Sequence, residues 1–206
     1  MRRLSQIIEE GLAHFRIGYD GHSLSQICTY VESLEEWNRR MNLVGLKETQ
    51  AIVQELIYDA FFLFTCVGDR VRILDLGSGA GILAVPMAVL GRDKAVFSVD
   101  KSLRKVQFQR HARRLLGLKN LSIFHSRSED LEPLGVDIVM AKAFGAASEA
   151  IRKGARHLRE GGSILLVRGK SEEPKKEEGF ASPEMREYRL PKSNKEYRLF
   201  VYKKVP

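Results

Sequence analysis

Seven consecutive residues in the middle of the chain, 75–81, have the types and spacing of a ligand-binding turn. An apolar run carries the carboxylate of Asp75 near its end, and Gly77, Gly79 and Gly81 follow at alternate positions before a second apolar run. Glycine tolerates the positive φ angles of a tight turn and lets a ligand lie against bare backbone. In open parallel sheets, ligands bind at such turns, outside the carboxyl ends of the strands.

Two classes of cofactor use turns of this kind, and the spacing favours one of them. The dinucleotide fingerprint is Gly-x-Gly-x-x-Gly, whereas this turn is Gly-x-Gly-x-Gly, with Ile82 where the third dinucleotide glycine would stand. Asp75 would repel a pyrophosphate but suits the sulfonium and ammonium groups of S-adenosylmethionine. Asp100, 19 residues after Gly81, can accept ribose hydroxyls in either class. The residues favour S-adenosylmethionine over a dinucleotide, with a degenerate site as the third alternative.

The elements that must position this turn alternate in type along the middle of the chain. Short apolar runs, expected as strands, alternate with amphipathic runs, expected as helices (strands 72–76, 95–99, 121–125, 136–140 and 163–168; helices 82–90, 103–116 and 146–158). This alternation predicts an α/β fold with a mostly parallel sheet and helices on both faces. Two further strand-like runs, 185–190 and 197–203, have no helix between them and predict a C-terminal antiparallel hairpin at one edge. The charged run 170–179 is expected to be a solvated loop.

The N-terminal third has a different pattern. Apolar residues recur at helical spacing over 4–16, over a segment that begins near Ser23, and over about 48–65, where Leu56 and Ala60 are expected to face inward. Ser23 is the expected N-cap of the second helix. We therefore expect residues 1–66 to form a helical N-terminal cap and residues 67–206 to form the domain that carries the turn.

The net charge of +8 is unevenly distributed. Residues 1–66 hold 6 Lys and Arg against 9 Asp and Glu, a net −3, and the remaining residues hold 28 against 17, a net +11. A basic domain indicates a polyanionic partner, most often nucleic acid. The expected helix after Asp100 carries cations and no acid (Lys101, Arg104, Lys105, Arg110, Arg113 and Arg114). It could contact RNA phosphates or be a solvated outer face.

Composition excludes several classes of protein. With 44% hydrophobic and 29% charged residues, the 206-residue chain is expected to be globular rather than disordered or fibrous. No uninterrupted apolar run approaches the ~20 residues of a membrane helix, and the acidic Glu9 and Glu10 argue against a secretory signal. Cys28 and Cys66 suit neither a disulfide framework nor a metal site, and the five histidines show no metal spacing. We expect a cytoplasmic protein with no metal, and nothing in the sequence demands more than a monomer.

Three separated segments together resemble one enzyme family. They are Trp-Asn-Arg-Arg-Met-Asn-Leu at 37–43, the turn at 75–81, and Ser-Arg-Ser-Glu-Asp at 126–130. The chain resembles the RsmG (GidB) family over nearly its whole length. These are bacterial class I methyltransferases that transfer a methyl group from S-adenosylmethionine to N7 of a guanine in 16S ribosomal RNA of the small subunit. The first segment is the most specific, since glycine turns are shared by all class I methyltransferases.

The resemblance implies a set of site residues. It implies cofactor contacts in and after the turn, at the ribose, at the adenine end and at the end of a later strand (Gly77, Ser78, Gly79, Gly81, Ile82, Asp100, Ser128, Glu129 and Lys142). Lys142 stands where the family usually has arginine, and Arg168 where it usually has lysine. Charge is kept in both, but a lysine cannot make a bidentate arginine contact.

Other positions depart further from the family pattern. The turn continues with Leu83-Ala84 in place of Pro-Gly, and Leu56 replaces a histidine of the third helix, whereas the following Asp59 is present. These differences bear on the substrate more than on the cofactor. An enzyme with another acceptor (a different RNA position, a protein or a small molecule) and a non-catalytic RNA-binding ribosome-assembly factor remain alternatives.

The chemistry implied by the resemblance needs no catalytic acid or base. N7 of guanine carries a lone pair and no proton, so catalysis depends on alignment with the methyl group and on positioned charge. Arg127, Lys142 and Arg168 are the substrate-positioning candidates, and each could instead pair with a nearby carboxylate for structure. Trp37 could stack on a base or belong to the core, and Asn38 and Asn42 could contact RNA or hold the junction of cap and sheet.

Overall fold

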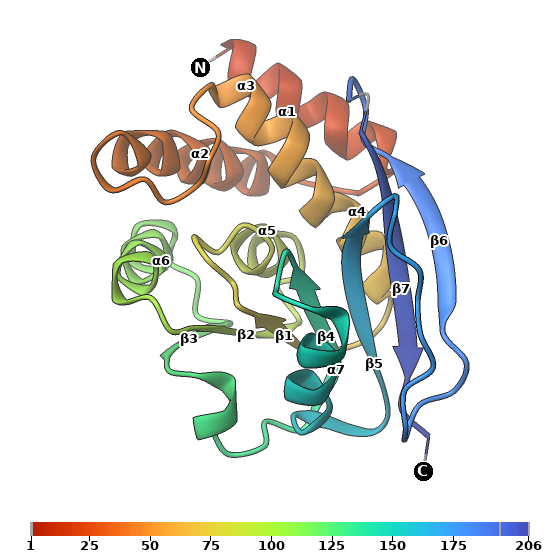
Figure 1. Ribbon diagram of the computed structural model, residues 1–206. Helices are drawn as coiled ribbons and strands as arrows, with labels where there is room; N and C mark the ends of the chain where they lie inside the picture. The colour runs from red at the N-terminus through yellow and green to blue at the C-terminus, as the bar shows by residue number, and fades with distance from the viewer. Residues whose placement is uncertain (1, 194, 206) are drawn as a thin grey trace.

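A seven-stranded sheet with strand order β3-β2-β1-β4-β5-β7-β6 organises the molecule (Figure 1). The computed structural model describes residues 2–193 and 195–205. The strands are β1 (Arg72–Leu76), β2 (Ala95–Asp100), β3 (Leu121–His125), β4 (Val136–Lys142), β5 (Leu158–Gly169), β6 (Glu184–Arg189) and β7 (Glu196–Lys203). The first five are mutually parallel, and β7 pairs antiparallel with both β5 and β6. The predicted α/β fold with an antiparallel hairpin at one edge is confirmed.

Helices cover both faces of the sheet, as the alternating pattern predicted. They are α1 (Arg2–His14), α2 (Gly21–Met41), α3 (Thr49–Ile52), η1 (Val53–Ile57), α4 (Tyr58–Val67), α5 (Ala84–Leu90), α6 (Leu103–Leu116), η2 (Ser128–Asp130) and α7 (Ala147–Ala155). In Figure 1, α5 and α6 lie between the sheet and a further layer made by α1, α2 and α3, whereas α7 lies on the opposite face.

Two hydrophobic clusters correspond to these two faces. The larger one runs from Ile8 of α1 through the helices to Leu199 of β7, and the smaller one lies between the sheet and α7. Tyr30 of α2 is fully buried against Phe108 of α6, with ring centroids 6.0 Å apart. Side chains of the first 66 residues therefore share a core with the sheet. The division of the chain into two parts after residue 66 stays a prediction.

The third predicted helix is present as a continuous segment, Thr49–Val67, formed by α3, η1 and α4. Its middle is a π-turn in which the N–H of Tyr58 donates to the carbonyl of Val53. The wider turn changes which side chains face inward: Val53 and Ile57 are fully buried, whereas Leu56, expected inside, is only half-buried. Regular helical spacing could not predict this shift, because a π-turn adds a residue to the helical repeat.

By length and composition alone, the same segment could cross a membrane. It has 19 residues and a mean hydropathy of 1.3 in its most apolar window, of which 56% is buried inside the protein. Its side chains at Ile52, Phe61 and Leu63 belong to the larger core cluster. Polar residues interrupt the segment, so a count of uninterrupted apolar runs does not detect it. Its packing is that of a helix in the core.

The N-terminus of α2 corrects one expectation. The N-cap is Asp20, not Ser23, and its Oδ1 accepts the N–H of Ser23 at 2.7 Å. That backbone hydrogen bond, together with Ser23 Oγ and Arg92, lowers the pKa of Asp20 to about 2. Aspartate and serine are both good N-caps, and here the cap lies three residues before the serine, which becomes the third residue of the helix.

Helix α1 packs on the segment Thr49–Val67, and this contact leaves no room for a side chain at Gly11. A Cβ there would collide with the ring of Tyr58, which is fully buried and donates its hydroxyl to the carbonyl of Ile7 at 2.6 Å. We expect Gly11→Ala to reduce the free energy of unfolding by about 1–3 kcal/mol, although alanine favours helix. Urea unfolding would measure it. Gly18→Ala, where a Cβ meets nothing within 4 Å, is the matched control; equal stability of the two variants would contradict this packing.

Candidate functional site

The glycine turn between β1 and α5 is anchored to the end of the neighbouring strand. The N–H groups of Gly77 and Ser78 both donate to the carbonyl of Val99, at 2.9 and 3.1 Å. Gly77 has φ +69°, and a Cβ there would collide with the ring of Phe144. Gly79 has φ +58° and faces open space, where a Cβ would meet only Lys105 Nζ at 3.9 Å. The turn therefore presents bare backbone on which a ligand can lie.

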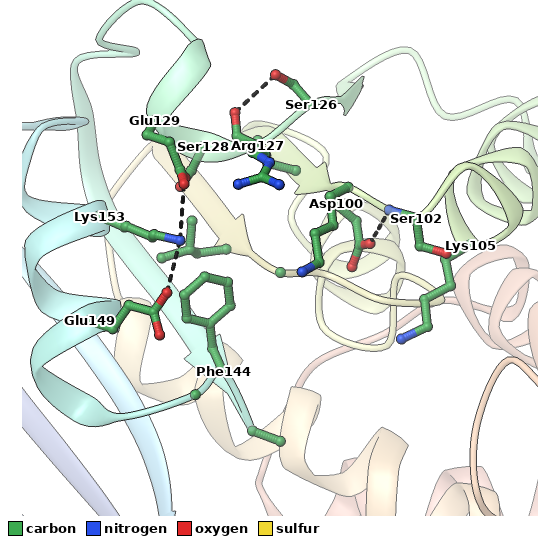
Figure 2. Close-up of a pocket in the computed structure, with 16 residues that line it drawn as sticks. Asp100, Ser102, Lys105, Ser126, Arg127, Ser128, Glu129, Phe144, Glu149 and Lys153 are labelled. Carbon is green, nitrogen blue, oxygen red and sulfur yellow. Dashed lines mark hydrogen bonds and ion pairs between the residues drawn. The ribbon is translucent and has the colours of Figure 1, made fainter.

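A cavity of about 400 Å³ opens beside this turn, at the carboxyl ends of the parallel strands (Figure 2). It lies within the range of about 300–1,000 Å³ that is common for small-molecule sites. Asp100 is the last residue of β2, and two backbone N–H groups hold its carboxylate in place. Gly79 donates to Oδ2 and Ser102 donates to Oδ1, both at 2.8 Å. Each oxygen retains a further lone pair, which can accept a ribose hydroxyl.

The wall opposite Asp100 in Figure 2 carries an ionised carboxylate. Glu129 accepts Ser128 Oγ at 3.1 Å and lies 3.1 Å from Lys153 Nζ, which also pairs with Glu149 at 2.9 Å. A hydrogen bond from its own backbone N–H, and then the one from Lys153, lower the pKa of Glu129 to about 2. The predicted Ser128 and Glu129 thus line the same cavity as Gly77 and Asp100.

A second cavity of about 280 Å³ lies on the other side of the turn and is lined by Asp75, Ile82 and Lys142. Asp75 is only 2% exposed, and its Oδ2 accepts the N–H of Ala84, the first residue of α5, at 3.1 Å. Burial raises the pKa of Asp75 to about 7; the Ala84 bond opposes this shift and the charge of Asp100 adds to it. This buried carboxyl would become more stable beside a cationic ligand.

The departure from the family at residues 83–84 leaves this arrangement intact. The group that holds Asp75 is the backbone N–H of Ala84, which a glycine would also supply. The Leu83 side chain lines the second cavity and belongs to the core. The substitution therefore changes the shape of one wall and keeps the hydrogen bond.

The segment that carries the most specific resemblance, 37–43, shapes the far wall of the second cavity. Asn38 is 9% exposed; it donates Nδ2 to the carbonyl of Leu46 at 2.8 Å and accepts the N–H of Val44 at 2.8 Å. Asn42 ends α2 with φ 47°. These contacts hold the loop 43–46 against the cavity. Trp37 packs on Phe108 with ring centroids 5.5 Å apart. Trp37 thus packs in the core and Asn38 holds the loop, as one of the two alternatives at these positions predicted; contact of these residues with RNA stays a prediction.

The structure separates the three substrate-positioning candidates. Arg127 is exposed and lines the first cavity, whereas Lys142 lines the second. Arg168 lines neither: it is 7% exposed and donates to the carbonyls of Gly145, at 2.8 Å, and Phe144, at 3.4 Å. It therefore supports the loop after β4.

Ser78, another predicted contact, has its hydroxyl turned inward. Its Oγ accepts Ser98 Oγ at 2.6 Å and Gln109 Nε2 at 2.8 Å. The hydroxyl therefore belongs to a buried network, and the N–H and carbonyl of Ser78 are paired as well, with Val99 and Gly81.

Sequence reasoning missed a buried network around Lys142. Its ammonium pairs with Asp59 and donates to the carbonyl of Glu55, in the π-turn, at 3.1 Å. Asp59 is 0% exposed, and its second oxygen accepts the hydroxyl of Tyr188, on β6, at 2.8 Å. Burial raises the pKa of Asp59, and Lys142 and Tyr188 oppose that shift. An aspartate within the apolar run 57–64 was the available signal for a buried pair, but nothing local indicated a partner 129 residues away.

Solved structures with a similar fold include methyltransferases. The protein superposes on an S-adenosylmethionine-dependent methyltransferase from Aquifex aeolicus with a TM-score of 0.56 and 17% identity, covering 76% of this chain and 93% of that one. For TrmN from Thermus thermophilus the TM-score is 0.58 with 21% identity, covering 72% and 49% of the two chains. At these identities the likeness concerns the fold, which is that of the class I methyltransferases.

Sequence comparison gives the family. Residues 23–200 match the GidB family model, described as rRNA small subunit methyltransferase G, and the chain belongs to this family. Relatives named Ribosomal RNA small subunit methyltransferase G include those of Geobacter sulfurreducens, 29% identical with 92% of both chains covered, and Bordetella pertussis, 29% identical with 81% of this chain and 76% of the relative covered. The resemblance found in the three sequence segments is confirmed.

The Tyr188 hydroxyl is expected to stabilise the fold through Asp59. Tyr188→Phe leaves a buried carboxylate oxygen without its donor, so we expect a loss of about 1–3 kcal/mol in the free energy of unfolding. Chemical denaturation would measure this loss. Tyr197→Phe is the control, because Tyr197 stacks on Tyr188 at 5.5 Å and its hydroxyl has no hydrogen-bond partner among the described residues. A loss of the same size in both variants would contradict a specific contribution of the hydrogen bond to Asp59.

Proposed function

We propose that the protein is an S-adenosylmethionine-dependent methyltransferase that methylates N7 of a guanine in small-subunit ribosomal RNA. The observation that carries the proposal is the pair of cavities flanking the glycine turn, one with Asp100 and the other with the buried Asp75. Membership of the GidB family, with relatives named for small-subunit ribosomal RNA, supports the acceptor.

The residues around the turn fit the cofactor. Asp100 is available to the ribose hydroxyls, and Ser128 with Glu129 to the adenine end, in the larger cavity. Gly79 leaves space for the ligand over the turn. Asp75, buried with no cation among the groups that set its pKa, suits the positively charged amino-acid end. When bound, S-adenosylmethionine supplies an electrophilic methyl group on its sulfonium.

The chain's own residues have to orient the base, since no proton must be removed from N7. The ammonium of Lys142 is fixed by Asp59 and by the carbonyl of Glu55 at the edge of the second cavity. Placed against guanine O6, it would hold the base and leave the N7 lone pair free. Arg127, exposed at the rim of the first cavity, is available to a neighbouring phosphate. Alignment and fixed charge then account for catalysis.

This function also gives the setting in which the protein works. Ribosomal RNA, free or within the small subunit, is the proposed partner, and the cytoplasm is the proposed location. The protein acts as a monomer in this proposal. The structure shows no group of metal-ligating side chains among residues 2–193 and 195–205.

The reaction can be tested directly. Small ribosomal subunits that lack the family's modification, and free small-subunit RNA, would be incubated with the protein and methyl-labelled S-adenosylmethionine, and the labelled base mapped. We expect label at a single guanine N7, and none with Asp100→Asn protein, which loses a charged acceptor for the ribose. Wild-type protein that binds the cofactor and labels neither RNA would exclude the ribosomal acceptor. Label at another atom would exclude N7.

Cofactor affinity is expected to depend on pH through Asp75. Its pKa of about 7 in the free protein should fall when a cation binds beside it, so binding releases a proton at neutral pH. As pH falls below 7, protonation of Asp75 should decrease the affinity by up to about tenfold per pH unit, in addition to any change from the ligand's own ionisation. Calorimetric titration from pH 5.5 to 8.5 would measure this dependence.

Asp75→Asn is the control for this titration, because its cofactor affinity should be low and should show only the ligand's own ionisation. The unfolded pKa of aspartate, about 3.9, lies below 7, so Asp75 destabilises the free protein progressively as pH rises from about 4 to 7. The variant should therefore melt at a higher temperature than the wild type at pH 8. An equal pH dependence of affinity in the two proteins would contradict the role of Asp75.

A further inference from the structure

A long stretch beside the larger cavity carries positive charge without compensation. Residues 101–128 contain eight cations and no acidic residue (Lys101, Arg104, Lys105, Arg110, Arg113, Arg114, Lys119 and Arg127). None of the eight has a carboxylate partner within the described residues 2–193 and 195–205. Near the opposite edge of the sheet, by contrast, three cations are paired: Lys170 and Arg189 both contact Glu196, and Arg198 contacts Glu187 at 2.9 Å.

The charges of α6 are placed unfavourably for the helix itself. Arg104 and Lys105 lie in its first turn, where the helix dipole favours acids, and Ser102 caps it without a side-chain hydrogen bond. Arg110 and Arg114 are four residues apart, a spacing at which like charges destabilise a helix. Only the last turn has favourably placed cations. The stability of α6 therefore does not explain why it carries so many cations. Binding of an external anion would explain them.

The location of α6 connects this charge to the proposed active site. Lys101 and Lys105 line the cofactor cavity at the start of the helix, and Arg127 lines it from the segment after β3 (Figure 2). The helix lies at the β3 edge of the sheet, at the opposite end from the β6–β7 hairpin (Figure 1). Arg104 and Arg114 are separated by roughly 15 Å along the axis at ~1.5 Å per residue. This length spans several phosphates of one strand.

We propose that the exposed face of α6 binds the sugar-phosphate backbone of the substrate RNA and leads the strand to the cofactor cavity. The inference rests on the proposed function, since it places that function's substrate. An anionic membrane surface fits less well. The exposed apolar residues of the helix, Leu103 and Leu115, are 51% and 50% exposed but lie at its two ends, separated by cations. They do not form the continuous apolar face that a membrane-surface helix presents.

The experiment compares two double variants of equal charge change. In Arg110→Gln/Arg114→Gln, both substitutions are on α6 and outside the cofactor cavity. In Lys175→Gln/Lys176→Gln, both are exposed in the loop 170–183, near the β5–β7 edge. Binding of a small-subunit ribosomal RNA fragment would be followed by fluorescence anisotropy at salt concentrations from 50 to 300 mM, with S-adenosylmethionine affinity and melting temperature measured for each protein.

For the α6 variant we expect RNA binding about 10- to 50-fold weaker at ~0.1 M salt. The slope of log K against log salt should be smaller by about 1.5, because each lost phosphate contact removes roughly 0.7–0.9. Cofactor affinity should be unchanged, and the melting temperature unchanged or higher, because a like-charge pair is removed. The loop variant should bind RNA as the wild type does. Equal RNA binding by the α6 variant and the wild type, or an equal loss in both variants, would overturn the proposal.

Two further results separate this inference from the function on which it rests. If the wild type methylates ribosomal RNA and the α6 variant does so with unchanged KM, the function stands and the role of α6 is wrong. If RNA binding depends on α6 but no guanine N7 is methylated, the RNA surface stands and the proposed reaction is wrong. Binding to vesicles of anionic phospholipid through α6, with no RNA binding by the wild type, would assign the surface to a membrane and overturn the proposal.

Discussion

Burial of the Asp75 carboxyl beside the glycine turn is the constraint on which the site depends. Its single backbone donor is the first N–H of α5, so strand, turn and helix must meet at this one group. A charged group buried in this way is costly unless a counter-charge arrives. The carboxyl therefore favours a positively charged ligand, and Gly79 lines the same cavity as Asp75. The same burial has two results: it gives the site affinity for a cation, and it makes the ionised form of Asp75 unfavourable when no cation is bound.

The N-terminal helices take part in this arrangement in addition to covering the sheet. Tyr30 of α2 donates its hydroxyl to the carbonyl of Ala80, within the turn, at 3.1 Å. At the end of the same helix, Asn38 folds the loop 43–46 onto the second cavity. Helix α4 places Asp59 against Lys142. Contacts from the N-terminal helices thus reach the turn, the loop 43–46 and Lys142, which gives a physical reason why the family resemblance extends to segment 37–43.

Much of the fold could be predicted from the sequence, because the strands around the turn are short apolar runs with clear ends. Strands 72–76 and 121–125 and the helix 103–116 have the bounds that their apolar patterns indicated. The π-turn and the Asp20 cap were missed, since both depend on a choice among locally similar options. For the site, residues near the turn in sequence were predicted best. Tyr188 was missed and the position of Arg168 misjudged, because their contacts join strands and loops that only the tertiary fold brings together.

The strand order has a consequence for folding during synthesis. β6 precedes β7 in the chain but pairs only with it, since β7 lies between β5 and β6. A nascent chain that has emerged only as far as β6 therefore has no place in the sheet for that strand, and Tyr188 cannot yet reach Asp59. Domains form progressively from the N-terminus during synthesis. Until the last strand is inserted, Asp59 can therefore have its ion pair with Lys142 of β4 but lacks the hydroxyl of Tyr188, so the hydrogen bonding of this buried acid is completed last.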